Sequence, residues 1–352
     1  MQTGIKEQVT GAENAIEIQG DYSWGFAQKE KATISDCLDL KDLDFKVKKG
    51  EFVVLAGKIG CGKSSLINAI CGNMIYLPKD ILAADNGEQH DQEYFQKLAQ
   101  DVSKIKPKQA PIKQMGTTAY CEQKAWIENK TIRDSITFGR PFDREKYDMV
   151  IKCMQLTKDL DVLKAGDQTE LGENGINLSG GQKTRVCCAR AVYGTDDIYL
   201  LDDPISDLDA ETGRKVFQQV IKGICNGKTT ILSTHSVDFF KLADRVAVIE
   251  DGKIVAFDHF DNLQDNEFIK GAVAEHGKQS ELLDDAGKSG KSEMTYEQIL
   301  QKIAEKNELK FIRAKTDGAK PSMFSAQSLI VPQNKAKSSF SNDLVPMRKR
   351  KS

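Results

Sequence analysis

The 352-residue chain lacks a long hydrophobic run and an excess of either charge. No apolar run approaches the roughly 18–20 residues that a bilayer span needs, and residues 1–15 are too polar for a signal peptide. With 50 basic and 52 acidic residues the net charge is −2, which gives no reason to expect nucleic-acid binding. We therefore expect a chain that is soluble by itself and does not insert directly into a membrane.

The cysteines also lack a pattern. The eight of them stand at 37, 61, 71, 121, 153, 187, 188 and 225, without the C-x-x-C pairs of a zinc site. We expect reduced packing residues, of which Cys61, inside a glycine-rich loop, is the one most accessible to thiol reagents.

That glycine-rich loop reads GKIGCGKS from Gly57 to Ser64 and matches the phosphate-binding pattern G-x-x-x-x-G-K-S. A short apolar strand precedes it and a helix follows it, as this motif requires. Glycines let successive backbone N–H groups point at a triphosphate, Lys63 adds positive charge, and Ser64 offers a hydroxyl to Mg²⁺. The residues expected around ATP in this loop are Gly57, Gly60, Cys61, Gly62, Lys63, Ser64 and Ser65.

Strands alternate with helices along residues 15–275, which favours a parallel sheet wrapped by helices, with antiparallel strands added near the N-terminus and near residue 250. We expect residues 1–14 to be disordered and 276–352 to form a flexible linker or tail. The stretch 77–110 is long and polar and is expected to be a surface insertion. It contains one possible amphipathic helix, with Phe95, Leu98, Val102 and Ile105 on one face.

Three further groups follow the ends of strands or begin a helix. Asp202 and Asp203 end an apolar strand, where Asp202 suits Mg²⁺ and Asp203 suits the position of a base for an attacking water. His235 follows the next strand, and ligands of such sheets bind at the carboxyl ends of strands. The run Leu178–Gln182 places a serine and two glycines at a helix start, which is a second anion site.

In this order the motifs resemble the nucleotide-binding domain of an ATP-binding-cassette (ABC) transporter. The resemblance covers roughly residues 15–275 and implies a P-loop NTPase with a RecA-like parallel core, antiparallel additions and a helical signature subdomain at 130–195. It implies that ATP and Mg²⁺ are bound. The roles it implies are catalysis by Lys63, Gln123, Asp203 and His235, Mg²⁺ binding by Ser64, Gln123 and Asp202, and nucleotide contact by Gln123, Ser179, Gly180, Gly181 and Gln182.

Finer features narrow the resemblance to the first nucleotide-binding domain of the multidrug-resistance-associated (C) subfamily. They are Trp24 and the segments 123–127, 131–139, 170–175 and 202–204. Trp24 stands where an adenine-stacking residue is expected, with Tyr22 as the rival stacker and a core position as the alternative. The segment Glu170–Gly175 resembles an exporter loop, which favours export over import.

Asp203 departs from the glutamate that a hydrolysing site of the family carries. A base must approach within about 2.6–3.2 Å of the proton that it removes and contributes roughly 10²–10⁴-fold. The resemblance therefore implies a site that binds ATP and hydrolyses it slowly, while the signature run completes a faster site on a partner. The alternative is that the water shifts to meet Asp203 and turnover is ordinary.

The resemblance also implies partners that this chain does not contain. These are membrane-spanning domains and a second nucleotide-binding domain in a head-to-tail dimer, at the cytosolic face of a membrane. We expect a split transporter subunit or an excised domain. The alternative function is that of a soluble ATP-dependent regulatory or binding module that takes no part in transport.

Overall fold

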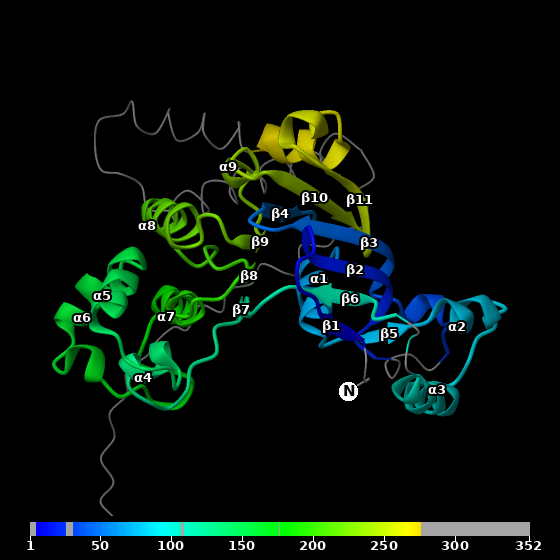
Figure 1. Cartoon of the computed structure of the whole chain (residues 1–352), viewed down its shortest axis with the longest axis horizontal. Helices are drawn as coiled ribbons and strands as arrows, with labels where there is room; N and C mark the ends of the chain where they lie inside the picture. Colours follow the sequence, from blue (N-terminus) through cyan, green and yellow to red (C-terminus); the bar gives the residue numbers. More distant parts are fainter. Residues whose placement is uncertain (1–4, 26–30, 106, 108, 176, 276–352) are drawn as a thin grey trace, which may run out of the picture. The chain divides into compact units, whose positions relative to one another are not determined.

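The computed structural model describes residues 5–25, 31–105, 107, 109–175 and 177–275. These residues form two sheets with helices packed against them (Figure 1). The larger sheet runs in the order β11-β10-β4-β9-β8-β7, and the smaller runs β1-β6-β2-β3 with β5 paired to β2. The expected α/β architecture, a parallel sheet wrapped by helices with antiparallel strands added, is confirmed.

The larger sheet is parallel except at its β10-β11 edge. Its hairpin turns at Asp251 and Gly252, whose φ values of +45° and +78° are those that a two-residue turn needs. Its strands are β4 (Phe52–Ala56), β7 (Thr118–Cys121), β8 (Ile198–Asp202), β9 (Thr229–Ser233), β10 (Arg245–Glu250) and β11 (Lys253–Asp258).

The smaller sheet is mainly antiparallel and supplies the additions that the sequence predicts. Its strands are β1 (Lys6–Gln8), β2 (Asn14–Ser23), β3 (Leu40–Lys48), β5 (Ile75–Leu77) and β6 (Ile112–Gln114). The prediction that residues 1–14 are disordered is wrong for the described part, because β1 pairs in parallel with β6 and Val9 donates its N–H to the Gln114 carbonyl at 2.9 Å. A three-residue edge strand has too weak a pattern to be recognised in sequence.

Two apolar clusters lie on opposite faces of the larger sheet. Along β4, Phe52 and Val54 point into one cluster and Val53 and Leu55 into the other, as the period of two in a strand requires. The second cluster also contains the buried face of α1 (Lys63–Cys71) and the inner face of the smaller sheet. The helix after the P-loop is therefore enclosed between the two sheets.

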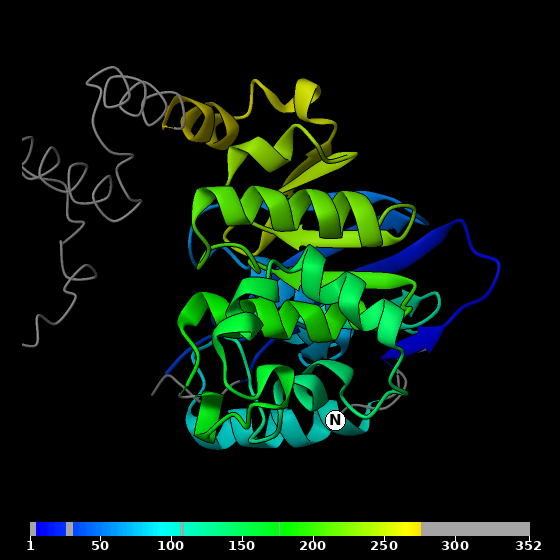
Figure 2. The ribbon, with the colours of Figure 1, turned by 90° about the vertical axis from the view of Figure 1, so that its left-hand side faces the viewer.

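The first cluster is covered by the remaining helices, which Figure 2 shows facing the viewer. The helix at 144–153 begins as expected, since the Asp143 carboxylate accepts the Lys146 N–H at 3.1 Å. These helices are α4 (Ile132–Thr137), α5 (Arg144–Cys153), α6 (Thr157–Val162), α7 (Gly180–Tyr193), α8 (Ala210–Val216), the π-helical turn η4 (Phe217–Ile224) and α9 (Val237–Phe240).

Short 3-10 turns connect the longer elements. They are η1 (Ser35–Cys37), η2 (Gly166–Gln168), η3 (Glu173–Gly175) and η5 (Phe260–Leu263). Residues 267–275 are helical. The predicted tail at 276–352 lies outside the described residues.

The predicted insertion folds onto the domain. Its helices are α2 (Lys79–Ala84) and α3 (Gln92–Lys104), and α3 confirms the expected amphipathic helix, with Phe95 and Val102 buried. Phe95 belongs to a third apolar cluster with Ala32, Ile34 and Leu77. We call residues 75–105 the α2–α3 insertion.

Within the described residues, none of the helices combines the length and the apolar composition that a membrane crossing requires.

The enclosed position of α1 leads to a stability prediction. Leu66 is fully buried between the two sheets, so Leu66→Ala should lower the free energy of unfolding by about 2–5 kcal/mol through lost transfer energy and a residual cavity. Val162→Ala, at a side chain that is 79% exposed, is the matched control and should change it by less than about 0.5 kcal/mol. Urea unfolding of the full chain measures both, and equal effects would contradict the enclosed position.

Candidate nucleotide-binding site

The P-loop backbone has the conformation that a phosphate cradle needs. Gly57, Gly60 and Gly62 have φ values of +151°, +80° and +113°, which side chains rarely tolerate. A Cβ on Gly57 would lie 2.4 Å from the Ile249 carbonyl oxygen. Gly62 is the N-cap of α1 and no side chain caps that end, so the first N–H groups of the helix are left for an anion.

Lys63 lies inside this loop and is 7% exposed. Its Nζ donates to the Gly57 carbonyl at 2.8 Å and to the Lys58 carbonyl at 3.0 Å. Burial lowers the pKa of Lys63, and the neighbouring Cys61, Asp203 and Asp202 oppose that shift. The ammonium is thus held against the loop that would surround the phosphates.

The expectation that Cys61 is the most accessible thiol is wrong. Cys61 is only 8% exposed because its side chain points into the loop, where a Cβ on Gly57 would come within 2.5 Å of its sulfur. Cys37, Cys71 and Cys153 are more exposed.

Asp202 ends β8 and is 2% exposed. In the part of the chain that the structure describes, its Oδ1 is buried without a hydrogen-bond partner. A buried carboxylate oxygen without a partner is costly unless something binds it. Its oxygen chemistry suits Mg²⁺, so this atom fits the predicted metal site.

Asp203 follows in a left-handed conformation, with φ +48°, and is 7% exposed. Its backbone N–H donates to the Ser233 carbonyl at 3.0 Å, which fixes it between β8 and β9. Burial, with the adjacent Asp202 charge, raises the pKa of Asp203 to about 6, and Lys63 opposes the shift. The carboxylate is therefore basic enough to accept a proton near neutral pH.

Strand pairing brings these groups to one sheet edge. Leu55 in β4 and Asp202 in β8 both lie opposite Ser233 in the parallel ladders. The P-loop, the two aspartates and His235, which follows β9, therefore emerge side by side. Burial and the Lys63 charge lower the pKa of His235, which favours its neutral imidazole.

Gln123 follows β7, which pairs with β8, and its side chain is exposed. Among the described residues no hydrogen bond joins it to Ser64 or Asp202. The sheet order places Gln123 next to the strand that carries Asp202, but its contact with Mg²⁺ stays a prediction.

Trp24 lies beside the P-loop, and half of its surface is exposed. Its indole N–H donates to the Ser65 hydroxyl at 3.1 Å, and its backbone N–H donates to the Asp39 carboxylate at 2.7 Å. The rival Tyr22 is fully buried, with its hydroxyl donating to the Gln19 carbonyl at 3.0 Å, so it has no free face for a base. Asp39 belongs to no motif, and no sequence signal indicated its role.

The signature run starts α7, where the sequence predicts a second anion site. Ser179 accepts the Gln182 backbone N–H, and the Gln182 side chain accepts the Ser179 N–H at 2.8 Å, which together make a capping box. Gln182 Nε2 also donates to Asp159 at 2.8 Å. The Gln182 side chain therefore supports the loop, a function that sequence reasoning missed because Asp159 lies in another helix.

The glycines of the signature run differ in their surroundings. Ser179 and Gly180 are exposed, and a Cβ on Gly180 would meet nothing within 4 Å. A Cβ on Gly181 would lie 3.0 Å from the Asp207 carbonyl oxygen, and Thr184 one turn later donates to the Asp207 carboxylate at 3.2 Å. Figure 1 shows α7 grouped with α4, α5 and α6, on the opposite face of the larger sheet from α1.

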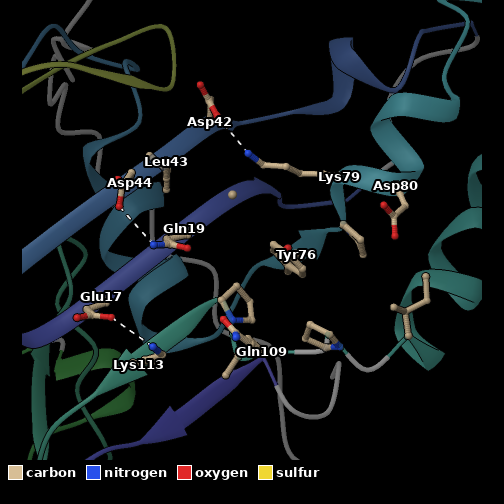
Figure 3. A pocket seen from close by; sticks show the side chains of 16 residues that line it. Glu17, Gln19, Asp42, Leu43, Asp44, Tyr76, Lys79, Asp80, Gln109 and Lys113 are labelled. Carbon is tan, nitrogen blue, oxygen red and sulfur yellow. Dashed lines mark hydrogen bonds and ion pairs between the residues drawn. The ribbon is translucent and has the colours of Figure 1, made fainter. Parts of the chain in front are cut away.

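A groove of about 890 Å³ lies elsewhere, over the outer face of the smaller sheet (Figure 3). Glu17, Asp42, Lys79 and Lys113 are among the side chains that line it. None of the predicted site residues does so, and the groove is therefore separate from the P-loop site.

Sequence comparison with known proteins agrees with the geometry of the P-loop site. Residues 40–206 match the family model described as ABC transporter. The chain carries an ABC transporter nucleotide-binding domain. The ABC domain is 42% identical over 226 residues to multidrug resistance protein mrp-7 of Caenorhabditis elegans, a match that covers 64% of this chain and 13% of that protein.

Two other relatives of the ABC domain have similar sequence identity to it. ATP-binding cassette sub-family C member 3 of Rattus norvegicus is 39% identical over 226 residues, covering 64% of this chain and 13% of that protein. The oligomycin resistance ATP-dependent permease YOR1 of Saccharomyces cerevisiae is 40% identical over 215 residues, covering 61% and 12%. The resemblance to the C subfamily is thus confirmed, and the matched region spans only 12–13% of the length of these relatives.

The position of Trp24 leads to a binding prediction for the ABC domain. Trp24→Ala should weaken Mg-ATP binding by roughly 5- to 150-fold, the equivalent of about 1–3 kcal/mol for one base stacked on one aromatic ring. Trp24→Phe should retain most of the affinity because it keeps an aromatic face. Titration calorimetry measures both, with Trp126→Phe as the control at the other tryptophan. Wild-type affinity in Trp24→Ala would contradict the stacking role.

Proposed function

We propose that this domain binds Mg-ATP and hydrolyses it slowly to drive an exporter at the cytosolic face of a membrane. The observation that supports this most directly is the meeting of the P-loop, Asp202 with its buried unpartnered Oδ1, and His235 at one edge of the larger sheet. The names of the relatives, which refer to multidrug and oligomycin resistance, support export of small molecules. Glu170–Gly175 fits the same direction of transport.

The division of labour among the residues follows from their positions. The N–H groups of the P-loop and Lys63 bind and orient the phosphates, and Trp24 binds the adenine. Ser64, Gln123 and Asp202 would hold Mg²⁺, which when bound neutralises charge on the β- and γ-phosphates. The lowered pKa of His235 favours the neutral imidazole, which can donate a hydrogen bond to the γ-phosphate without adding charge.

A second nucleotide-binding domain is needed to use the signature run. Ser179 and Gly180 are exposed at the start of α7, with open space in front of Gly180. The P-loop of the same chain precedes α1, on the other face of the larger sheet. The signature run would therefore contact the nucleotide of a partner domain in a head-to-tail dimer. The membrane-spanning domains of the exporter would receive the mechanical work of that dimer.

Slow hydrolysis at the chain's own site is attributed to the reach of Asp203 and not to its basicity. Burial raises its pKa to about 6, which suits a base that works near pH 7. Its backbone, however, is fixed by the N–H bond to Ser233, and Ser206 donates to its carbonyl at 3.0 Å. A carboxylate one methylene shorter than glutamate on an anchored backbone falls short of the water, at a cost of about 3–5 kcal/mol in the barrier.

Single-turnover hydrolysis of radiolabelled ATP by the full chain tests this, at concentrations where the chain dimerises. Asp203→Glu should accelerate the chemical step by at least about tenfold, because it restores part of a general-base effect of roughly 10²–10⁴-fold. Asp203→Asn should slow it by less than about threefold, since a base that does not reach contributes little. ATP affinity should be unchanged in both variants.

The opposite pattern would remove the slow-site proposal. It consists of wild-type turnover near 1–10 s⁻¹, no gain in Asp203→Glu and a large loss in Asp203→Asn. Asp203 would then be an adequate base and the site an ordinary one.

A further inference from the structure

The strand end that precedes Trp24 is held by the α2–α3 insertion. β5, the first strand of the insertion, pairs with the last residues of β2, with Tyr22 opposite Tyr76 and Ser23 opposite Ile75. The Tyr22 and Tyr76 rings lie 5.6 Å apart. Trp24 is thus the next residue after a strand end that the insertion fixes.

The same insertion also holds the chain from Ala32 onward. Ala32 and His90 exchange backbone hydrogen bonds, at 3.2 Å and 2.8 Å. Two residues further on, Ile34 is 1% exposed and shares an apolar cluster with Phe95 of α3 and Leu77 of β5. The side chains of the insertion therefore bury Ala32 and Ile34 and cover part of Cys37 and Leu38, in the segment that precedes β3.

Asp39 connects this segment to Trp24. Its carboxylate accepts the Trp24 backbone N–H at 2.7 Å, and its own N–H donates to the Tyr22 carbonyl at 3.0 Å. A second link runs from Lys79 at the start of α2 to Asp42 in β3, at 3.9 Å, and is drawn in Figure 3. A displacement of α3 would be transmitted through Ile34 to Asp39, and from there to the indole at the P-loop.

We propose that the α2–α3 insertion is a brace that positions Trp24, and that its docking sets adenine affinity while leaving phosphate binding at the P-loop unchanged. This inference rests on the proposed role of Trp24 as the adenine-stacking residue. Phe95 and Ile34 are positioning residues, because they act through Asp39 and Trp24. A brace matters because apparent affinity falls in proportion to the fraction of molecules in which Trp24 is correctly placed.

The test uses the full chain with Trp126→Phe, so that Trp24 is its one remaining tryptophan. Phe95→Ala and Ile34→Ala each undo the contact from one side, and Lys97→Ala, on the exposed face of α3, is the matched control. Affinity is measured for Mg-ATP and for magnesium tripolyphosphate, which occupies the P-loop without an adenine. Trp24 emission reports whether the indole has moved into water.

Each brace variant should lower the affinity for Mg-ATP by about tenfold, as when only a tenth of the molecules hold Trp24 in place. The affinity for tripolyphosphate should change by less than about twofold. Trp24 emission should shift to the red. The Phe95→Ala, Ile34→Ala double variant should bind Mg-ATP no more weakly than either single variant, because both substitutions remove the same contact. Lys97→Ala should match the parent protein.

Unchanged Mg-ATP affinity, or an equal loss for both ligands, would overturn the brace. Should Phe95→Ala fail to fold, Ile34→Val removes a single methyl group from the same cluster and should shift the ratio of the two affinities in the same direction. Failure of the proposed Trp24 role has a different signature, since Trp24→Ala would then bind Mg-ATP normally whatever the brace variants do.

Discussion

The parallel pairing of β4, β9 and β8 is the constraint on which the site depends. Each strand contributes its chemistry from the residues just past its carboxyl end, so the ladder register decides which groups meet. Ser233 in β9 lies opposite both Leu55 and Asp202, and its carbonyl accepts the Asp203 N–H. Because β8 is buried on both faces, a slip by one residue would exchange the side chains that it presents to the two apolar clusters and would shift the aspartates relative to the P-loop.

The position of α1 also links the P-loop to the end of β2, which precedes Trp24. Because α1 is enclosed between the two sheets, its first turn lies within reach of the end of β2, and Trp24 can bond to Ser65. The P-loop is thus built on the larger sheet, and Trp24, the proposed adenine-stacking residue, follows a strand of the smaller one. If Trp24 has that role, a movement of β2 relative to α1 would change how adenine fits while leaving the phosphate loop intact.

Sequence reasoning succeeded where spacing along the chain carries the chemistry. Three features depend only on neighbours within a few residues and can therefore be recognised in the sequence. They are the P-loop, Asp202 at the end of its strand, and the capped start of α7. Sequence reasoning failed for Asp39, Asp159 and the segment 32–38, whose partners lie 15 or more residues away and belong to no motif. The sequence predicted the apolar face of α3 that carries Phe95 but not what covers it, because that cluster is completed by Ala32 and Ile34, which precede the P-loop.

The backbone at Asp203 shows why the short side chain is compatible with the fold. Its φ of +48° is a conformation that aspartate visits more readily than glutamate, since a short polar side chain can bond locally. Left-handed positions cost about 1–3 kcal/mol for other residues. Glutamate at this position would gain reach toward the water but lose part of that local compatibility. Aspartate therefore favours a stable, well-anchored backbone at this position, which is consistent with the proposal that the site binds ATP and hydrolyses it slowly.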